Sequence, residues 1–157
     1  MIILPIEKPP DDCSYCWRGV SIEGYIIGKT VDWQAFCPKK EDIVIENWLG
    51  VSVNWDLNNN DDAVQELLTR KKKKNGEKQF KGGAVRIPRI EIDRIIGQYE
   101  ADKEMTYELR NDNDENEYHG NLLYGETLNQ AVNKRRTICG ALTKVVDDSR
   151  RQENQDA

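Results

Sequence analysis

Histidine is the side chain best suited to proton transfer near neutral pH, and this chain of 157 residues has one, His119. It lies beside Tyr118 and close to Asn121, and it follows an acidic run, 111–117, whose carboxylates would fix its tautomer. With Arg18, Tyr118 and Asn121 as ligand contacts and His119 as general base, the chain would be a small enzyme or a nucleotide-binding protein. The alternative is that His119 is a hydrogen-bonded structural residue. A single imidazole excludes sites that need two histidines.

Cysteine is the second residue type that could do chemistry. Cys13 and Cys16 have the spacing with which two thiolates bind one zinc ion, but Cys37, His119 or Cys139 would have to supply two further ligands from distant segments. We therefore favour the interpretation that Cys13 and Cys16 are small buried hydrophobic residues, and we expect no metal and no cofactor. Without a secretion signal, all four cysteines are expected to be reduced thiols of a cytoplasmic protein.

The charged residues are distributed unevenly along the chain. The segment from Arg70 to Arg94 has ten Lys or Arg residues against three acids, whereas the whole chain has a net charge of −5. From Glu100 to Glu117 the chain has eight acids and two bases. Separate basic and acidic surfaces favour binding to a larger protein partner. The expected binding residues in the basic stretch are Lys71, Lys72, Lys73, Lys74, Arg86 and Arg89.

The same basic stretch, 70–94, is also compatible with nucleic-acid binding, because lysine and arginine neutralise phosphates. Phe80 is the one aromatic residue within it, so it offers no stacking platform for single strands. A third interpretation is a solvated helix end and loop tip. The chain has no glycine-rich phosphate loop, no Gly-x-Ser-x-Gly elbow and no His-Glu-x-x-His helix. A non-enzymatic interaction module is therefore the preferred function.

Length and periodicity predict a single compact α+β domain over 1–146, followed by a mobile tail at 147–157 that has no apolar anchor. Apolar residues alternate with polar or small ones over 43–56, which is typical of a half-buried strand. Helical spacing of apolar residues predicts two main helices, at about 61–72 and 128–146, against a small, mostly antiparallel sheet. Further strands are expected at 25–27, 84–87 and 105–109.

Two segments leave alternatives open. The apolar run 2–6, closed by Pro9 and Pro10, is either an edge strand or an arm lying on the domain, and it is too short to span a membrane. The isoleucines of 90–96 fit both a strand and a short helix. No membrane partner is expected.

Four short landmarks follow one another along the chain, at 17–20, 34–36, 50–53 and 115–123. In this order they resemble the Arg-Gly, Ala-Phe, Leu-Ser-Val and Glu-Asn-Pro-x-His-Ala landmarks of a group of small uncharacterised bacterial proteins. The chain departs from that pattern at Glu117, where proline is usual. The resemblance implies a small bacterial cytoplasmic protein that is encoded beside larger partners and has no known activity. Together with the charge distribution, this favours an interaction module or accessory subunit of a larger bacterial assembly.

Overall fold

The computed structural model describes residues 7–28, 30–39, 42–45, 48–98, 104–110, 116–125, 128 and 131–153. Its centre is a seven-stranded antiparallel sheet with the strand order β7-β8-β5-β1-β6-β9, and β4 pairs with β5 outside this path. The strands of this sheet are β1 (Tyr15–Val20), β4 (Ile43–Ile45), β5 (Trp48–Trp55), β6 (Gly83–Pro88), β7 (Met105–Leu109), β8 (His119–Tyr124) and β9 (Asp147–Glu153). A separate hairpin joins β2 (Ile26–Ile27) and β3 (Thr30–Val31).

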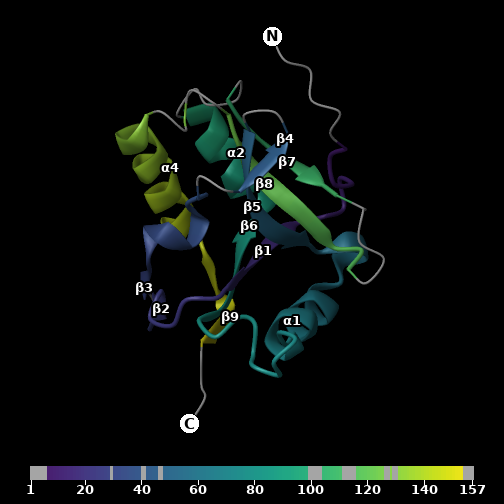
Figure 1. Ribbon diagram of the computed structural model, residues 1–157. Coiled ribbons are helices and arrows are strands. Elements are labelled where there is room, and N and C mark those ends of the chain that lie inside the picture. The colour runs from purple at the N-terminus through teal and green to yellow at the C-terminus, as the bar shows by residue number, and fades with distance from the viewer. Residues whose placement is uncertain are drawn as a thin grey trace.

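Helices cover both faces of the sheet (Figure 1). On one face, the first helix packs against β1 and β6, while the other two long helices and a short 3-10 helix lie on the opposite face. The helical elements are η1 (Trp33–Phe36), η2 (Leu57–Asn59), α1 (Asp61–Arg70), α2 (Arg89–Gln98) and α4 (Val132–Lys144). The predicted α+β class is therefore confirmed.

Strand β5 is the central element of the sheet, and it forms because apolar side chains alternate along it. Leu49, Val51, Val53 and Trp55 are all buried, the last three of them in the main core, whereas Ser52 between them is exposed. A strand with one apolar and one polar face must bury the apolar face against another layer, which here consists of η1, α2 and α4. Together β4 and β5 account for the strand predicted at 43–56.

Close backbone approach requires glycine where β8 crosses the core. A Cβ atom on Gly120 would meet the backbone oxygen of Glu108 and the indole nitrogen of Trp55. That indole donates a hydrogen bond of 2.9 Å to the same Glu108 oxygen. Gly120 of β8 therefore leaves room for a buried hydrogen bond that joins β5 to β7.

Helix α1 has acidic residues, Asp61 and Asp62, in its first turn and a basic residue, Arg70, in its last, which suits the helix dipole. It buries Val64 and Leu68 in a small second cluster on its face of the sheet. The helix predicted at about 61–72 ends at Arg70, because the next residue, Lys71, is extended.

The isoleucine-rich segment after Pro88 forms helix α2. Ile92, Ile95 and Ile96 lie three and four positions apart and are all buried, so the segment packs as one helical face. Helix α4 likewise buries Ile138, Cys139 and Leu142. The helix predicted at 128–146 runs from Val132 to Lys144, and residues 129 and 130 lie outside the described residues.

The chain after α4 differs from the expectation of a mobile tail at 147–157. Residues Asp147–Glu153 form β9, which pairs antiparallel with β6. This segment has no apolar residues to bury, and it is held instead by backbone pairing with β6 and by an ion pair between Asp147 and Arg86. The apolar run 2–6 and most of the acidic run, 111–115, lie outside the described residues. No helix in the described part of the chain is long and apolar enough to cross a membrane.

Candidate functional site

The structure places His119 at the start of β8, on the sheet face that carries α1. Its Nε2 atom lies 3.4 Å from the hydroxyl oxygen of Ser52 on the neighbouring strand. The register pairs Asn54 with His119 and Ser52 with Asn121, so these four side chains share one polar face of the β5–β8 pair. Histidine and a hydroxyl are thus brought together, a contact that the sequence analysis did not anticipate.

Asn121 is held in a buried polar network rather than presented to solvent. Its amide donates to the Oε1 atom of Glu108 at 2.9 Å, and Arg110 donates to both oxygens of the same carboxylate at 2.8 and 3.0 Å. Glu108 is 2% exposed, so this carboxylate depends on these donors for compensation of its charge. The network fixes β7 against β8 and supports the strand that carries His119.

Tyr118 and Arg18, the two other expected ligand contacts, lie apart. Tyr118 packs against the small cluster under α1, where its hydroxyl accepts a hydrogen bond of 3.4 Å from Asn60. Trp17 is paired with Asn54, so the Trp17 side chain lies on the same face of the sheet as His119. Neighbouring residues of a strand point to opposite faces, so the Arg18 side chain lies on the other face. The structure therefore gathers His119, Ser52 and Asn121 but does not bring Arg18 to them.

Arg18 lies where two strands diverge. One edge of β5 pairs with β4 at Trp48 and Leu49 and with β1 at Asn54 and Trp55, so the backbone between these pairs faces a gap. Arg18 crosses this gap: its Nε donates to the Ala35 oxygen at 2.9 Å and its Nη1 donates to the Ser52 oxygen at 2.9 Å.

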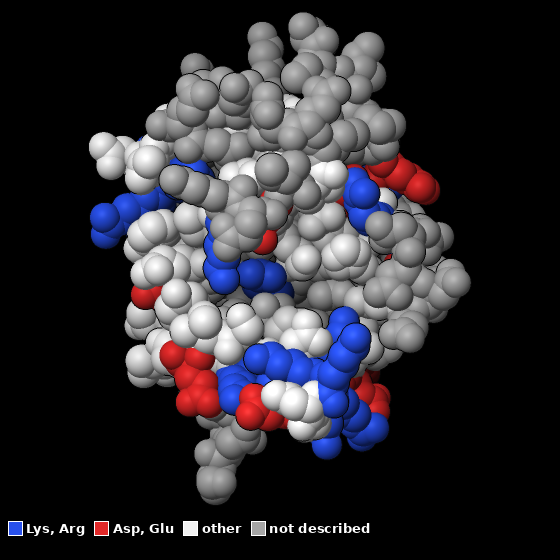
Figure 2. Space-filling model, viewed as in Figure 1, with Lys and Arg blue, Asp and Glu red and all other residues white. Residues whose placement is uncertain are grey.

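A cleft of about 400 Å³ opens beside this arginine, lined by residues that include Gln34, Cys37, Lys39 and Asp42. Burial lowers the pKa of the Arg18 guanidinium, and nearby negative groups such as Asp42 oppose that shift. Figure 2 shows basic surface in the middle of the face in view, where η1 approaches the sheet.

Two of the six expected basic contacts stabilise the fold. Arg86 is 6% exposed, forms ion pairs of 2.5 Å with Asp61 and 2.6 Å with Asp147, and lies 3.8 Å from the centre of the Tyr15 ring. Arg89 donates to the backbone oxygens of Pro9 and Pro10 and holds the N-terminal segment against the domain. Both guanidinium groups are therefore engaged within the fold, and Arg89 remains half-exposed.

The four consecutive lysines lie in a turn that we call the basic turn, residues 71–79. Backbone hydrogen bonds from Lys73 to Glu77 at 2.7 Å and from Gln79 to Lys71 at 2.9 Å close it. Lys72, Lys73 and Lys74 are exposed and Lys71 is half-buried. Within the described part of the chain, none of the four lysines forms an ion pair.

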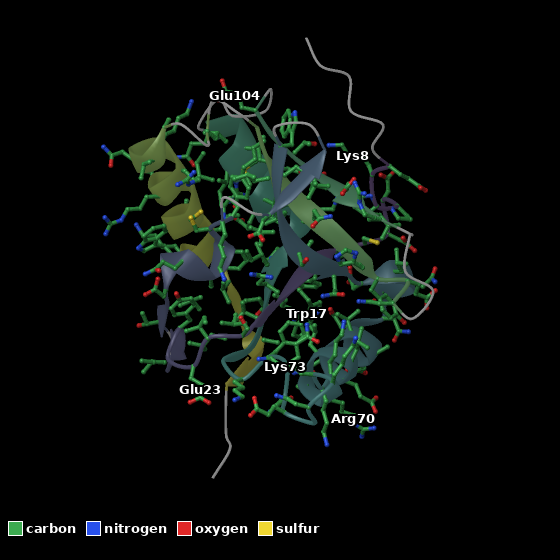
Figure 3. All side chains as sticks on the ribbon, in the orientation of Figure 1. Lys8, Trp17, Glu23, Arg70, Lys73 and Glu104 are labelled. Carbon is green, nitrogen blue, oxygen red and sulfur yellow. The ribbon has the colours of Figure 1, made fainter. Side chains whose placement is uncertain are left out.

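The basic turn lies at one end of the molecule. Figure 3 shows Lys73 below Trp17 and next to Arg70 at the end of α1. Lys and Arg side chains gather there, flanked by acidic side chains (Figure 2). Phe80, just after the turn, covers Gly19 and packs against the cluster under α1. The aromatic residue of the basic stretch is therefore half-buried against this cluster.

Cys13 and Cys16 are both buried in the main core. Burial raises the pKa of the Cys13 thiol to about 11 and raises that of Cys16 further. Among the described residues, no group of three His, Cys, Asp or Glu side chains is arranged to hold a metal ion.

The chain was compared with models of protein families, with curated proteins and with solved structures. None of them matches it. The residues and their geometry are therefore the basis for a functional proposal.

Proposed function

We propose that the chain is a non-enzymatic interaction module, an accessory subunit that binds an acidic surface of a larger protein through the basic turn. The observation that carries this proposal is the state of Lys71–Lys74. Arg86 and Arg89 are used within the fold, whereas these four lysines project from a hydrogen-bonded turn without ion pairs in the described residues.

A fixed turn is a better docking element than a flexible tail with the same charge. Because backbone hydrogen bonds already hold the basic turn, binding costs less conformational entropy. Each rim contact between a lysine and a carboxylate contributes roughly 0.2–1 kcal/mol, and such contacts mainly accelerate association and select the partner. We therefore expect other contacts of the same surface to supply much of the affinity.

The basic turn supports an acidic protein better than a nucleic acid. Phe80 is packed over Gly19, so the turn presents no aromatic side chain on which a base could stack. The whole chain also has a net charge of −5, which opposes non-specific binding to a polyanion.

The test is native mass spectrometry of the protein co-expressed with the proteins encoded beside it. We expect a stoichiometric complex that the double substitution Lys72→Glu and Lys74→Glu weakens by about tenfold in Kd, from two lost contacts and added repulsion. The matched control places the same charge change on exposed lysines of α4, with Lys134→Glu and Lys144→Glu, and should bind like the unchanged protein.

A complex that resists the change at Lys72 and Lys74 would refute a role for the basic turn. A partner that proves to be nucleic acid would also overturn the proposal, and the affinity would then fall steeply with salt. Circular dichroism of both double variants controls for loss of fold.

The contact of His119 with Ser52 favours a second candidate, a small enzyme or nucleotide-binding protein. Under this hypothesis His119→Ala abolishes turnover or ligand affinity without changing the melting temperature. The measurement is a thermal-shift screen with a nucleoside triphosphate and a dinucleotide. Equal shifts for the unchanged protein and for His119→Ala would eliminate this candidate.

A further inference from the structure

Two cysteines that are far apart in the sequence meet beside the cleft. Cys37 directly follows η1, and Cys139 lies in the middle of α4, which packs against η1. The Cys139 thiol donates to the Phe36 oxygen at 3.4 Å, the backbone oxygen directly before Cys37. The hydroxyl of Tyr124 donates to the same Phe36 oxygen at 2.8 Å. The Cys139 sulfur is therefore held against the backbone that carries Cys37.

The two thiols differ in their exposure. Cys37 is half-buried and lines the cleft beside Arg18, whereas Cys139 is fully buried beneath it. A small solute that enters the cleft therefore reaches Cys37 first. Cys139 does not line the cleft.

Their protonation states differ as well. The hydrogen bond from Cys139 and the positive charge of Arg135 lower the pKa of Cys37 to about 6. The same contact and burial raise the pKa of Cys139. At neutral pH, Cys37 is the thiolate and Cys139 the thiol, and the thiolate is the nucleophile in cysteine chemistry.

We propose that Cys37 and Cys139 form a peroxide-responsive dithiol, in which Cys37 reacts with a hydroperoxide in the cleft and Cys139 then closes a disulfide. This proposal is independent of the basic turn and of His119. It assigns a modification site to Cys37, directly after η1, and to Cys139 in α4, with hydroperoxides as the class of oxidant.

The first step is an attack of the Cys37 sulfur on the outer oxygen of the hydroperoxide. A sulfur–oxygen bond forms, the oxygen–oxygen bond breaks, and the departing alkoxide or hydroxide takes a proton from water, which replaces the proton that the Cys37 thiol lost to solvent on ionising. Cys37 becomes a sulfenic acid. In the second step the Cys139 sulfur attacks the Cys37 sulfur, the sulfur–oxygen bond breaks, and hydroxide leaves as water with the proton from Cys139. Two thiols and one hydroperoxide give one disulfide, one alcohol and one water.

The experiment uses the full chain, reduced, freed of reductant and exposed to a small excess of hydrogen peroxide. Intact mass should fall by two hydrogen atoms, and peptide mapping should find Cys37 linked to Cys139, with reversal by dithiothreitol. Cys139→Ser should stop at the sulfenic acid, so that dimedone adds to Cys37. Cys37→Ser should leave Cys139 unoxidised at the same peroxide concentration.

Cys13→Ser is the matched control, since it removes a cysteine of the same core that has a raised pKa. It should form the Cys37–Cys139 link at the unchanged rate. If a serine at the buried position 139 unfolds the chain, Cys139→Ala takes the place of Cys139→Ser in the dimedone experiment. Circular dichroism shows which variants are folded.

Three results would overturn the proposal. One is that the protein without substitutions loses its Cys37 thiol but forms no disulfide with Cys139. Another is oxidation of Cys13 or Cys16 at the same rate as Cys37. The third is a Cys139→Ser variant, folded by circular dichroism, in which dimedone fails to label Cys37.

Discussion

Replacing Arg86 with methionine should lower the free energy of unfolding by about 3–5 kcal/mol, the usual cost of breaking a buried ion pair from one side. Methionine approximates the length of the side chain but carries no charge. In the native fold, the carboxylates of Asp61 and Asp147 lie 2.5 and 2.6 Å from the Arg86 guanidinium. Without the guanidinium, these two negative charges would repel one another. The substitution would also remove the contact between the cation and the Tyr15 ring at 3.8 Å.

The structure places the expected loss near the lower end of this range. The side chains of Asp61 and Asp147 are 14% and 21% exposed, so water relieves part of the repulsion that remains. A loss of about 3 kcal/mol in a chain of this size corresponds to a fall in melting temperature of roughly 6–12 °C. The assay is urea unfolding followed by tryptophan fluorescence, analysed for midpoint and slope.

Arg94→Met is the matched control. Arg94 is 61% exposed and pairs with Glu91 one turn earlier in α2, so its loss should cost at most about 0.5 kcal/mol. If Arg86→Met costs less than about 1 kcal/mol, or no more than Arg94→Met, the reasoning about Arg86 is refuted.

Three further predictions rest on single residues. Burial raises the pKa of Asp56 from 3.8 to about 6, so the folded state binds the Asp56 proton more tightly than the unfolded state. The free energy of unfolding should therefore fall as the pH rises from about 4 to about 6. Urea midpoints measured across this pH range should show the fall, and Asp56→Asn should remove most of the pH dependence. Gly120→Ala should cost about 1–3 kcal/mol because its Cβ meets the Glu108 oxygen, whereas Gly97→Ala, in open space on α2, should stabilise by about 0.5–1 kcal/mol; equal thermal shifts would contradict both. The rate of Cys37 alkylation by iodoacetamide should rise with a midpoint near pH 6, and a midpoint at the ordinary thiol value of 9.0 would show that Cys139 and Arg135 do not stabilise the thiolate.

Sequence periodicity is informative where one side of an element is solvated. Strand β5, helix α1 and strand β7 each follow an alternating or helical pattern, and their positions agree with the prediction from the sequence. The apolar pattern predicts no strand at β1 or β8. Both are largely buried, and polar residues such as Arg18 and Asn121 interrupt their apolar pattern. Their compensating partners lie on other segments, so a local pattern cannot reveal them.

The candidate site shows the same limit. The sequence places Arg86 in a basic stretch, but its partners Asp61 and Asp147 are 25 and 61 positions away. Only the sheet order brings them together. Cys37 and Cys139 come together for the same reason, since η1 and α4 pack against one another on the same face of the sheet. The exposure of Lys72, Lys73 and Lys74 agrees with the interpretation of this segment as a solvated helix end and loop tip, because exposure of a charged run depends mainly on local composition.

The position of β9 has a consequence for how the protein is made. A ribosome delivers β1, β5 and β6 within the first 88 residues, but β8 follows only at residues 119–124 and β9 only at 147–153. Until then, the nascent chain has one edge of β5 and one edge of β6 without their strands, and such edges pair readily with other chains. The final strand thus completes the outer edge of β6. A chain cut before Asp147 would expose that edge permanently and would be prone to aggregate.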